Sequence, residues 1–293
     1  MPAVNSSQTV SDALHTATAM LSRVTSSARL DAELLLEYVT GLPRVSFRSA
    51  PERELPTAAG WSFQQLVMRR MKGEPVAYIR GQQEFWSLLL EVTPAVLIPR
   101  PETELLVELT LAHLRNDAPT TASMTERIAV ADLGTGSGAI ALAIASERPQ
   151  AQVVATDASN DALTVASRNA GRLQLANVSF LHGDWCAPLG EQRFDAIVSN
   201  PPYIAPEDRD IAPEVRRYEP GAALFAGNGG LESLTVIARQ SPRHLRPGGW
   251  LLLEHGWKQG PQVRDLLVRN GFAHVRSHAD LAGHERVTEG CLP

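Results

Sequence analysis

The stretch Val130–Ala145, VADLGTGSGAIALAIA, joins a short apolar run to an Ala-rich segment through three closely spaced glycines. An apolar strand that meets Gly134, Gly136 and Gly138 and passes at once into a helix makes a tight turn, where the backbone can approach a ligand closely. In doubly wound α/β folds the carboxyl end of the first strand borders a binding crevice. We therefore expect an α/β domain with a ligand at this turn.

Apolar runs and helical patterns alternate along the rest of the chain, which favours a layered α/β fold with a mostly parallel sheet. The last two predicted strands have only a short connection, 280–285, so a hairpin there makes the last strand antiparallel to its neighbour. A polar loop is expected over 117–127. The predicted strands are 128–133, 152–156, 178–181, 194–199, one from Trp250, 273–277 and 286–289, and the predicted helices are one starting at Pro101, 139–146, 161–173, 231–245 and 262–269.

The N-terminal part has a different pattern. Apolar residues recur at helical spacing over 10–24, 30–39 and 63–71, whereas 84–98 has the character of a strand or hairpin. We therefore predict a helical domain at 1–83, a connector at 84–98 and the α/β domain at 99–293.

The composition narrows the class of protein. The chain has 293 residues, 44% of them hydrophobic, and a net charge of -5, so no overall basic field indicates a nucleic-acid binder. The two cysteines, Cys186 and Cys291, form no CxxC pair, which favours a reduced, cytoplasmic protein. The N-terminus has no secretory signal pattern, no apolar stretch is long enough to span a bilayer, and a monomer without a metal site is expected.

Two acidic residues bear on the ligand. Gly134–Ala139 also fits the G-x-G-x-x-A pattern of NAD-binding proteins. Asp132, two residues before the first glycine, disfavours a pyrophosphate and suits the positively charged S-adenosylmethionine. Asp157 follows the next strand, where a carboxylate binds ribose hydroxyls, and this supports a nucleoside ligand without choosing between the two.

The next two strand ends carry further polar and aromatic groups. Asp184 follows the third strand and is placed to accept from an adenine amine. Trp185 fits a core side chain and an adenine platform equally well, and its place after a strand favours the ligand. The fourth strand ends in Asn200-Pro201-Pro202-Tyr203, where two prolines remove backbone donors and send the chain out of the sheet along an extended path.

This NPPY segment can hold a planar, polar group such as an amide. An amide nitrogen is a poor nucleophile because its lone pair is delocalised into the carbonyl. The side-chain oxygen of Asn200 and the carbonyl of Pro201 can accept its two N–H donors, Pro202 fixes the loop, and Tyr203 can stack on the planar group. Catalysis of this kind depends on positioning and electrostatics.

Longer strings resemble one family. DLGTGSGAIALA, GDW and NPPY, in this order, resemble class I S-adenosylmethionine-dependent methyltransferases. GEPVAYIRG (73–81), EFWSL (84–88), LIPRPETELLVE (97–108), LLLEHGW (251–257) and ERVTEG (285–290) resemble the release factor glutamine N5-methyltransferases, the PrmC/HemK family. The segments 226–233 and 281–287 keep only part of the family pattern.

The resemblance implies a Rossmann-like fold with a seven-stranded, mostly parallel sheet, and methyl transfer to the glutamine of the Gly-Gly-Gln loop of peptide chain release factors. It implies that Asn200, Pro201, Pro202 and Tyr203 hold the glutamine, with Asn200, Pro201 and Tyr203 catalytic. The cofactor S-adenosylmethionine would be held by Gly134, Thr135, Gly136, Ser137, Gly138, Asp157, Asp184, Trp185 and Asn200.

Three alternatives stay open at this point. The same clamp suits the exocyclic amine of adenine, so an N6-adenine methyltransferase acting on DNA or ribosomal RNA is the first of them. An NAD-dependent oxidoreductase is disfavoured by Asp132, and a non-enzymatic binding module by the intact NPPY. The pair Glu254-His255 is interpreted as a strand end with a structural histidine, and the acids at 207–214 as a solvated flap over the site.

Overall fold

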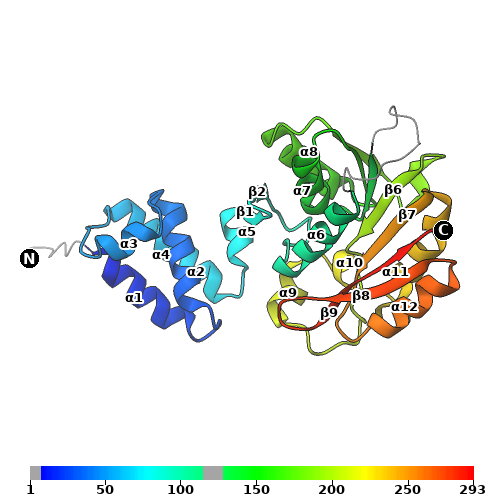
Figure 1. Cartoon of the computed structure of the whole chain (residues 1–293). Coiled ribbons are helices and arrows are strands. Elements are labelled where there is room, and N and C mark those ends of the chain that lie inside the picture. Colours follow the sequence, from blue (N-terminus) through cyan, green and yellow to red (C-terminus); the bar gives the residue numbers. More distant parts are fainter. Residues whose placement is uncertain (1–7, 115–127) are drawn as a thin grey trace, which may run out of the picture. The chain divides into compact units, whose positions relative to one another are not determined.

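The chain divides into two compact units, Met1–Gly81 and Gln82–Pro293. The computed structural model describes residues 8–114 and 128–293 (Figure 1). The polar loop expected over 117–127 lies outside the described residues, and the segment 84–98 belongs to the second unit. Within the described ranges, no helix combines the length and apolar character needed to cross a bilayer.

The first unit is helical. The three predicted helices are present, and their apolar faces meet in a core that includes Leu14, Leu35 and Phe63. The sequence did not predict α3 or α5, because each has only five residues, too few to show a helical period. The helices of this unit are α1 (Val10–Leu21), α2 (Ala28–Thr40), α3 (Val45–Ser49), α4 (Thr57–Met71) and α5 (Val76–Arg80).

The second unit contains the predicted seven-stranded sheet, in the order β5-β4-β3-β6-β7-β9-β8. The first five strands in this order are parallel, and β9 runs antiparallel to both β7 and β8 as the hairpin predicts. A separate hairpin, β1 with β2, precedes them. The strands are β1 (Gln82–Phe85), β2 (Leu88–Glu91), β3 (Ala129–Leu133), β4 (Gln152–Asp157), β5 (Val178–His182), β6 (Phe194–Ser199), β7 (Leu245–Glu254), β8 (Ala273–Ala279) and β9 (Glu285–Cys291).

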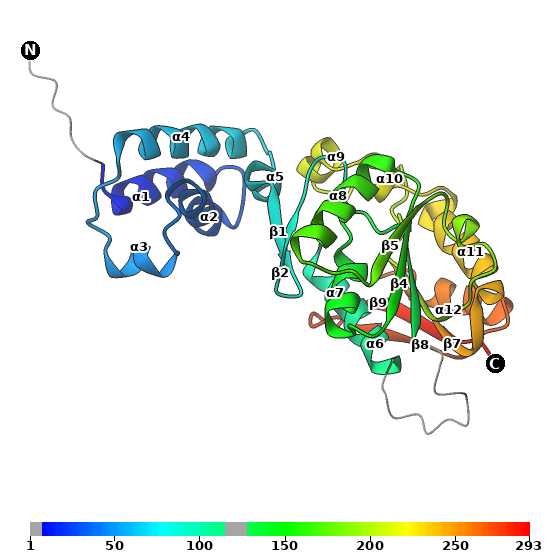
Figure 2. The ribbon, with the colours of Figure 1, turned by 90° about the horizontal axis from the view of Figure 1, so that it is seen from above.

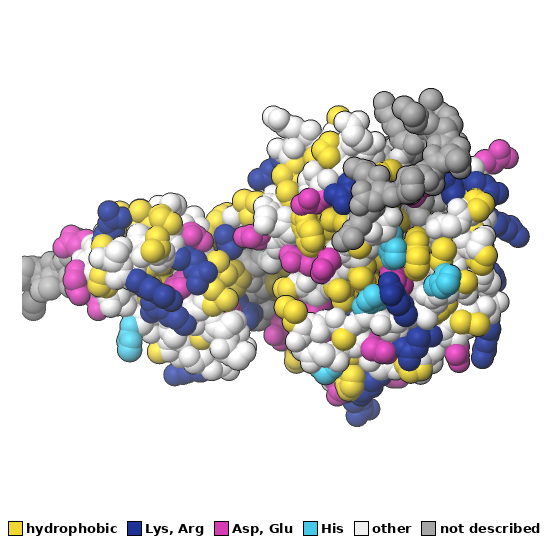
Figure 3. Space-filling model, in the orientation of Figure 1, with side chains coloured by type: hydrophobic (Ala, Val, Ile, Leu, Met, Phe, Trp, Pro, Cys, Tyr) yellow, Lys and Arg dark blue, Asp and Glu magenta, His cyan; other side chains and the backbone are white. Residues whose placement is uncertain are grey.

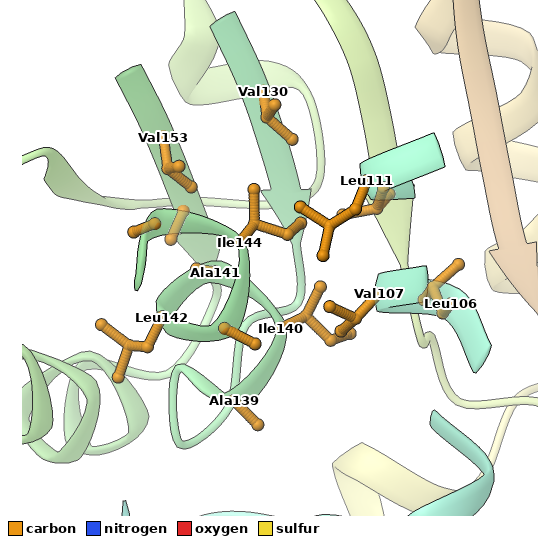
Figure 4. Packing of buried hydrophobic residues seen from close by; sticks show 14 of the residues in the cluster. Leu106, Val107, Leu111, Val130, Ala139, Ile140, Ala141, Leu142, Ile144 and Val153 are labelled. Atoms are coloured by element: carbon orange, nitrogen blue, oxygen red, sulfur yellow. The ribbon is translucent and has the colours of Figure 1, made fainter. Parts of the chain in front are cut away.

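Helices cover both faces of this sheet (Figure 2). Alternate residues of one strand face opposite cores, so Val130 packs with the helices of one face and Ala131 with those of the other. In helix α7 (Ala139–Glu147), every residue from Ala139 to Ala145 is buried. Figure 4 shows the side chain of Ile144 from this helix between Val130 and Leu111. One face carries α6 (Glu104–His113), α7 (Ala139–Glu147) and α8 (Asn160–Arg172), and the other carries α11 (Glu232–Gln240) and α12 (Gly260–Arg269).

In the first unit α4 begins at Thr57, six residues before the predicted start, and in the second unit the largest boundary differences lie between α11 and β7. The helix ends at Gln240, earlier than predicted, and a 3-10 turn, Ser241–Arg243, follows it because Pro242 interrupts the helical pattern. The strand then begins at Leu245 and not at Trp250, and its register with β6 shifts between Phe194 and Ala196. Further short helices lie in the described connections: the 3-10 turns Pro101–Thr103, Ala187–Leu189 and Asn228–Gly230, and the helices α9 (Pro213–Tyr218) and α10 (Gly221–Leu224).

A buried carboxylate ties α6 to the antiparallel end of the sheet. The side chain of Glu289 is fully buried, with Nε2 of His113 at 2.8 Å, Nε of Arg276 at 2.6 Å and Nε2 of His278 at 3.2 Å from its oxygens. Burial raises its pKa, but the hydrogen bonds with His113 and Arg276, together with the charge of His113 and the nearby His278, outweigh burial and lower the pKa to about 2, from 4.5. The carboxylate therefore stabilises the fold above pH 4.5.

We expect Glu289→Gln to lower the free energy of unfolding at pH 7 by on the order of 3 kcal/mol. Since the folded-state pKa is depressed, this difference between wild type and variant should shrink as the pH falls from about 4.5 toward 2. Denaturant unfolding at several pH values measures it, with the exposed Glu84→Gln as the control. A difference that stays constant down to pH 2 would contradict the assignment.

Candidate active site

The carboxyl ends of β3, β4, β5 and β6 meet at a cavity of about 450 Å³, a size typical of small-molecule sites. The segments 95–103 and 220–233 complete its wall. The sequence placed candidate residues at all four strand ends, and the topology brings them together. Those that line the cavity are Gly134, Thr135, Gly136, Ser137, Asp157, Asp184, Trp185, Asn200 and Pro202, whereas Gly138, Pro201 and Tyr203 do not line it.

The glycine turn is pinned to the neighbouring strand. The amides of Gly134 and Thr135 both donate to the carbonyl of Thr156, at 2.8 and 2.9 Å. Gly136 has a positive φ of 56° and lines the cavity, and a Cβ added there would meet no protein atom within 4 Å. The turn therefore presents bare backbone to the space that a ligand would fill.

Asp132 stabilises this turn from the protein interior and does not line the cavity. Its Oδ2 accepts from the Thr135 hydroxyl at 2.7 Å and from the Ala141 amide at 3.2 Å, and the residue is fully buried. Burial raises the pKa of Asp132 to about 7, although both hydrogen bonds oppose the rise. Its Oδ1 is buried without a hydrogen-bond partner among the described residues. The residue thus shapes the turn, a role that the sequence did not predict.

Asp157 and Trp185 stand on adjacent strand ends. The two carboxylate oxygens of Asp157 accept from the amides of Gly136 and Ser159, each at 2.9 Å, which fixes the carboxylate of a residue that lines the cavity. The indole of Trp185 is half-buried and packs on the turn, since a Cβ at Gly134 would lie 3.2 Å from its ring. Asp184 beside it is exposed.

These residues fit S-adenosylmethionine. Each oxygen of Asp157 keeps a free lone pair for a ribose hydroxyl after accepting one amide. Trp185, Ile140 and Ala162 supply apolar surface for an adenine ring in the same cavity. The open space above Gly136 allows the closest approach of the ligand to the backbone.

Asn200 and Pro202 of the NPPY segment line the cavity, whereas Pro201 and Tyr203 do not. The Asn200 side chain lines the cavity and its Nδ2 donates to the hydroxyl of Thr103 at 3.1 Å. Pro201 is buried. The Tyr203 hydroxyl donates to Oε1 of Glu254 at 3.2 Å, and burial, with the charge of Glu254, raises the pKa of Tyr203.

Glu254 and His255 are both buried, but they have different partners. His255 has the Thr288 hydroxyl 2.7 Å from Nε2 and the Gly256 carbonyl 3.0 Å from Nδ1, as expected of a structural histidine. Glu254 faces the NPPY segment. Burial raises its pKa to about 7, although the nearby Thr103 hydroxyl and the hydrogen bond from Tyr203 oppose the rise.

Sequence reasoning missed several residues that hold the site. Asn169 of α8 donates to the carbonyl of Ser137 at 2.9 Å and so supports the glycine turn. Glu219 is buried, pairs with Arg100 and accepts from the amide of Ile98 at 3.1 Å, which links the two segments that complete the cavity wall. These contacts join residues 32 or more positions apart, so local patterns do not indicate them.

A third support lies under Tyr203. Nε2 of Gln259 donates to the Tyr203 carbonyl at 3.0 Å, and Oε1 of Gln259 accepts from the Gly256 amide at 2.8 Å. Gly230 lies against the same carbonyl, with a φ of 87°.

We expect Gly230→Ala to destabilise the protein by about 1–3 kcal/mol and to lower turnover. The added Cβ would lie 2.1 Å from the Tyr203 carbonyl oxygen, so the segment that carries the NPPY motif must move. Thermal unfolding and turnover measure the effect. Gly229→Ala is the matched control, because Gly229 also has a positive φ but its Cβ would meet nothing within 4 Å. Equal effects of the two changes would rule out the contact as the cause.

Comparisons with known proteins agree with the geometry. A family model described as the PrmC N-terminal domain matches residues 12–81, and one described as the methyltransferase small domain matches residues 108–220. The release factor glutamine methyltransferase of Pseudomonas aeruginosa is 51% identical over 264 residues, which cover 90% of this chain and 92% of that protein. The protein of the same description from Coxiella burnetii is 46% identical over 267 residues, covering 91% and 93%. A solved methyltransferase structure from Pyrococcus furiosus is similar in fold, with a TM-score of 0.52 at 21% identity over 78% of this chain and 96% of that one.

Proposed function

This chain belongs to the release factor glutamine methyltransferase family, and we infer that it transfers a methyl group from S-adenosylmethionine to the side-chain amide nitrogen, N5, of a glutamine in peptide chain release factors. The observation that carries the proposal is the placing of Asn200 in the wall of the cavity that Asp157 and the glycine turn also line. A methyl donor and an amide acceptor can then meet in one space. Within the release factor, the Gly-Gly-Gln loop is the proposed acceptor segment.

The proposed cofactor contacts follow the strand ends. Asp157 binds the ribose hydroxyls, and Gly134 to Ser137 pass close to the ligand through their backbone. Asp184 and Trp185 take the adenine, and Gly138 supports the start of α7 behind the turn. When bound, S-adenosylmethionine supplies a sulfonium, which is a good leaving group for methyl transfer.

The proposed contacts with the glutamine amide depend on which protein groups accept its hydrogen bonds. Oδ1 of Asn200 and the carbonyl of Pro201 accept the two amide N–H groups, which draws electron density to the nitrogen. Pro202 lines the cavity, and Tyr203 holds the path of the segment through its contacts with Glu254 and Gln259. Preorganised acceptors of this kind lower the barrier because they need no rearrangement during the reaction.

The experiment that tests the function offers the purified chain release factor, DNA and ribosomal RNA side by side with labelled S-adenosylmethionine. We expect label on one glutamine of the release factor, located by peptide mass mapping. Label on adenine with none on glutamine would favour an N6-adenine methyltransferase. On the face drawn in Figure 3, Lys and Arg side chains are interspersed with Asp and Glu side chains, which suits a protein acceptor better than a polyanion.

We also propose that the chain acts as a monomer in the cytoplasm, where translation ends, and that it needs no nucleic acid. In addition, we propose that the N-terminal helical part, residues 1–83, recognises the protein substrate. The helical unit carries exposed apolar side chains, among them Tyr38 and Trp61, which are 48% and 64% exposed. Exposed aromatic groups of this kind are enriched where proteins bind one another.

A chain that begins at Gln82 should therefore bind S-adenosylmethionine as the full chain does but methylate release factor poorly. Calorimetry with the cofactor serves as the control for folding, and kcat/KM for the release factor is the measured quantity. Equal kcat/KM for the shortened and full-length chains would refute a role of the helical unit in recognition.

A further inference from the structure

The side-chain amide of Gln259 binds three segments of the chain at once. Its Oε1 accepts from the Gly256 amide at 2.8 Å, and its Nε2 donates to the carbonyls of Tyr203 at 3.0 Å and Gly229 at 3.4 Å. A flipped amide would set the oxygen against two carbonyls and the NH₂ group against an N–H donor. These contacts therefore fix which end of the amide faces each segment.

Gln259 is itself held in a well-defined turn. It is half-buried and lies directly before α12, its backbone amide donates to the Gly256 carbonyl at 2.8 Å, and its carbonyl accepts from the Val263 amide at 3.0 Å. Together with the bond from the Gly256 amide to Oε1, these contacts tie the side chain to its own backbone turn. The NH₂ group is therefore presented from a fixed position on the scaffold.

The two carbonyls that Nε2 binds belong to segments with separate places in the site. Tyr203 ends the NPPY segment, in which Asn200 and Pro201 are the proposed acceptors for the glutamine amide. Gly229 belongs to the segment 226–233, which forms part of the cavity wall and is called the wall segment below. One NH₂ group thus bridges the NPPY segment and the wall segment.

The NPPY segment is short and stiff between its two ends. Its start is fixed by β6, whose last residue, Ser199, donates from its hydroxyl to a carbonyl of β3 at 2.7 Å. Pro201 and Pro202 have no freedom in φ, so few backbone torsions remain between Asn200 and Tyr203. A contact that fixes the Tyr203 carbonyl therefore also fixes the direction of the Pro201 carbonyl.

We propose that Gln259 is a positioning residue, which holds the NPPY segment at the spacing from the wall segment that methyl transfer needs. The inference rests on the proposed function, because the acceptor amide has to meet the methyl group between groups that these segments carry. A misplacement of about 1 Å can lower turnover on the order of 100-fold. Two backbone bonds of Ile204, with Leu224 at 3.0 Å and Ala226 at 2.9 Å, still join the segments without Gln259. Its loss should therefore change the spacing and leave the fold intact.

The test separates the donor and acceptor roles of Gln259. We expect Gln259→Met, which keeps the volume and loses both, to lower kcat for release factor by about 10- to 100-fold. Gln259→Glu keeps an acceptor for the Gly256 amide but, as a carboxylate, offers no donor to Tyr203, so its kcat should be at least as low. KM for release factor and Kd for S-adenosylmethionine should each change less than about threefold. Gln240→Met is the matched control with unchanged kcat, because Gln240 is also half-buried and its Oε1 accepts the Cys186 amide at 3.3 Å, away from the cavity.

Three results overturn the inference. The first is a wild-type kcat for Gln259→Met, and the second is an equal loss of kcat in Gln240→Met. The third is a wild-type kcat for Gln259→Glu, which would leave the donor to Tyr203 without a role. Thermal unfolding is measured for each variant, and if Gln259→Met does not fold, the isosteric Gln259→Glu decides alone. A wild-type chain that transfers no methyl group to glutamine would instead refute the proposed function.

Discussion

Asn200→Ala should lower kcat for methyl transfer to release factor by about 10²–10³-fold, the effect of removing one preorganised polar group from an active site. The side chain lines the cavity and is held by Thr103, so its oxygen meets the acceptor amide in a fixed position. Its interaction strengthens as the amide nitrogen gains positive charge during alkylation, because the N–H groups that it accepts become more acidic. The loss should therefore appear in kcat and far less in the affinity for S-adenosylmethionine.

Labelled-methyl transfer under single-turnover conditions measures this effect, together with calorimetry of cofactor binding. Asn270→Ala provides the matched control, because Asn270 is half-buried beyond α12 and does not line the cavity. Tyr203→Phe should keep much of the activity, while Tyr203→Ala should not, and Pro201→Ala should be milder than Asn200→Ala. An Asn200→Ala enzyme within tenfold of wild type would remove this residue from the proposed mechanism.

Asp157→Ala should weaken S-adenosylmethionine binding by about 1.5–3 kcal/mol, the range for hydrogen bonds to a charged group. This corresponds to a rise in Kd of roughly 10- to 150-fold. The change removes backbone contacts as well as the ribose contact. The ribose hydroxyls lose their acceptor, and the amide of Gly136 loses the carboxylate that fixes the glycine turn.

Isothermal titration of wild type and variant with S-adenosylmethionine gives the Kd values directly. Asp161→Ala is the control, since Asp161 is an exposed acid in the first turn of α8 outside the cavity. An unchanged Kd in a folded Asp157→Ala protein would exclude this carboxylate from the cofactor site. Saturable binding of NAD to the wild-type chain would revive the oxidoreductase hypothesis.

The predicted elements were local in origin, and most of them are present in the structure. Strand and helix patterns in the second unit have enough residues to reveal their periods, and the short connection before Glu285 indicated the antiparallel hairpin. The elements and boundaries that were not predicted have local causes too. The helices α3 and α5 are too short to show a period, and Pro242 and the Pro247-Gly248-Gly249 run hid the early start of β7.

The candidate site could be predicted as a set of strand ends, because parallel strands place their carboxyl ends on one edge of the sheet. Its internal contacts could not be predicted. Asp132 was expected to face the ligand, yet its carboxylate turns inward to Thr135 and Ala141. The direction of a side chain at a strand end depends on the neighbours that surround it, and those come from distant parts of the chain.

By itself, the sequence determined the family, the α/β class and the chemical groups at the four strand ends, because these depend on residue types and short spacings. The tertiary structure alone decided which of the polar groups are hydrogen-bonded to one another. Asn200 donates to Thr103 and Tyr203 donates to Glu254, and these pairs from three separated segments form only when the fold brings them together. Burial makes each unsatisfied polar group costly, so hydrogen-bond polarity in the interior is a property of the fold and not of any local motif.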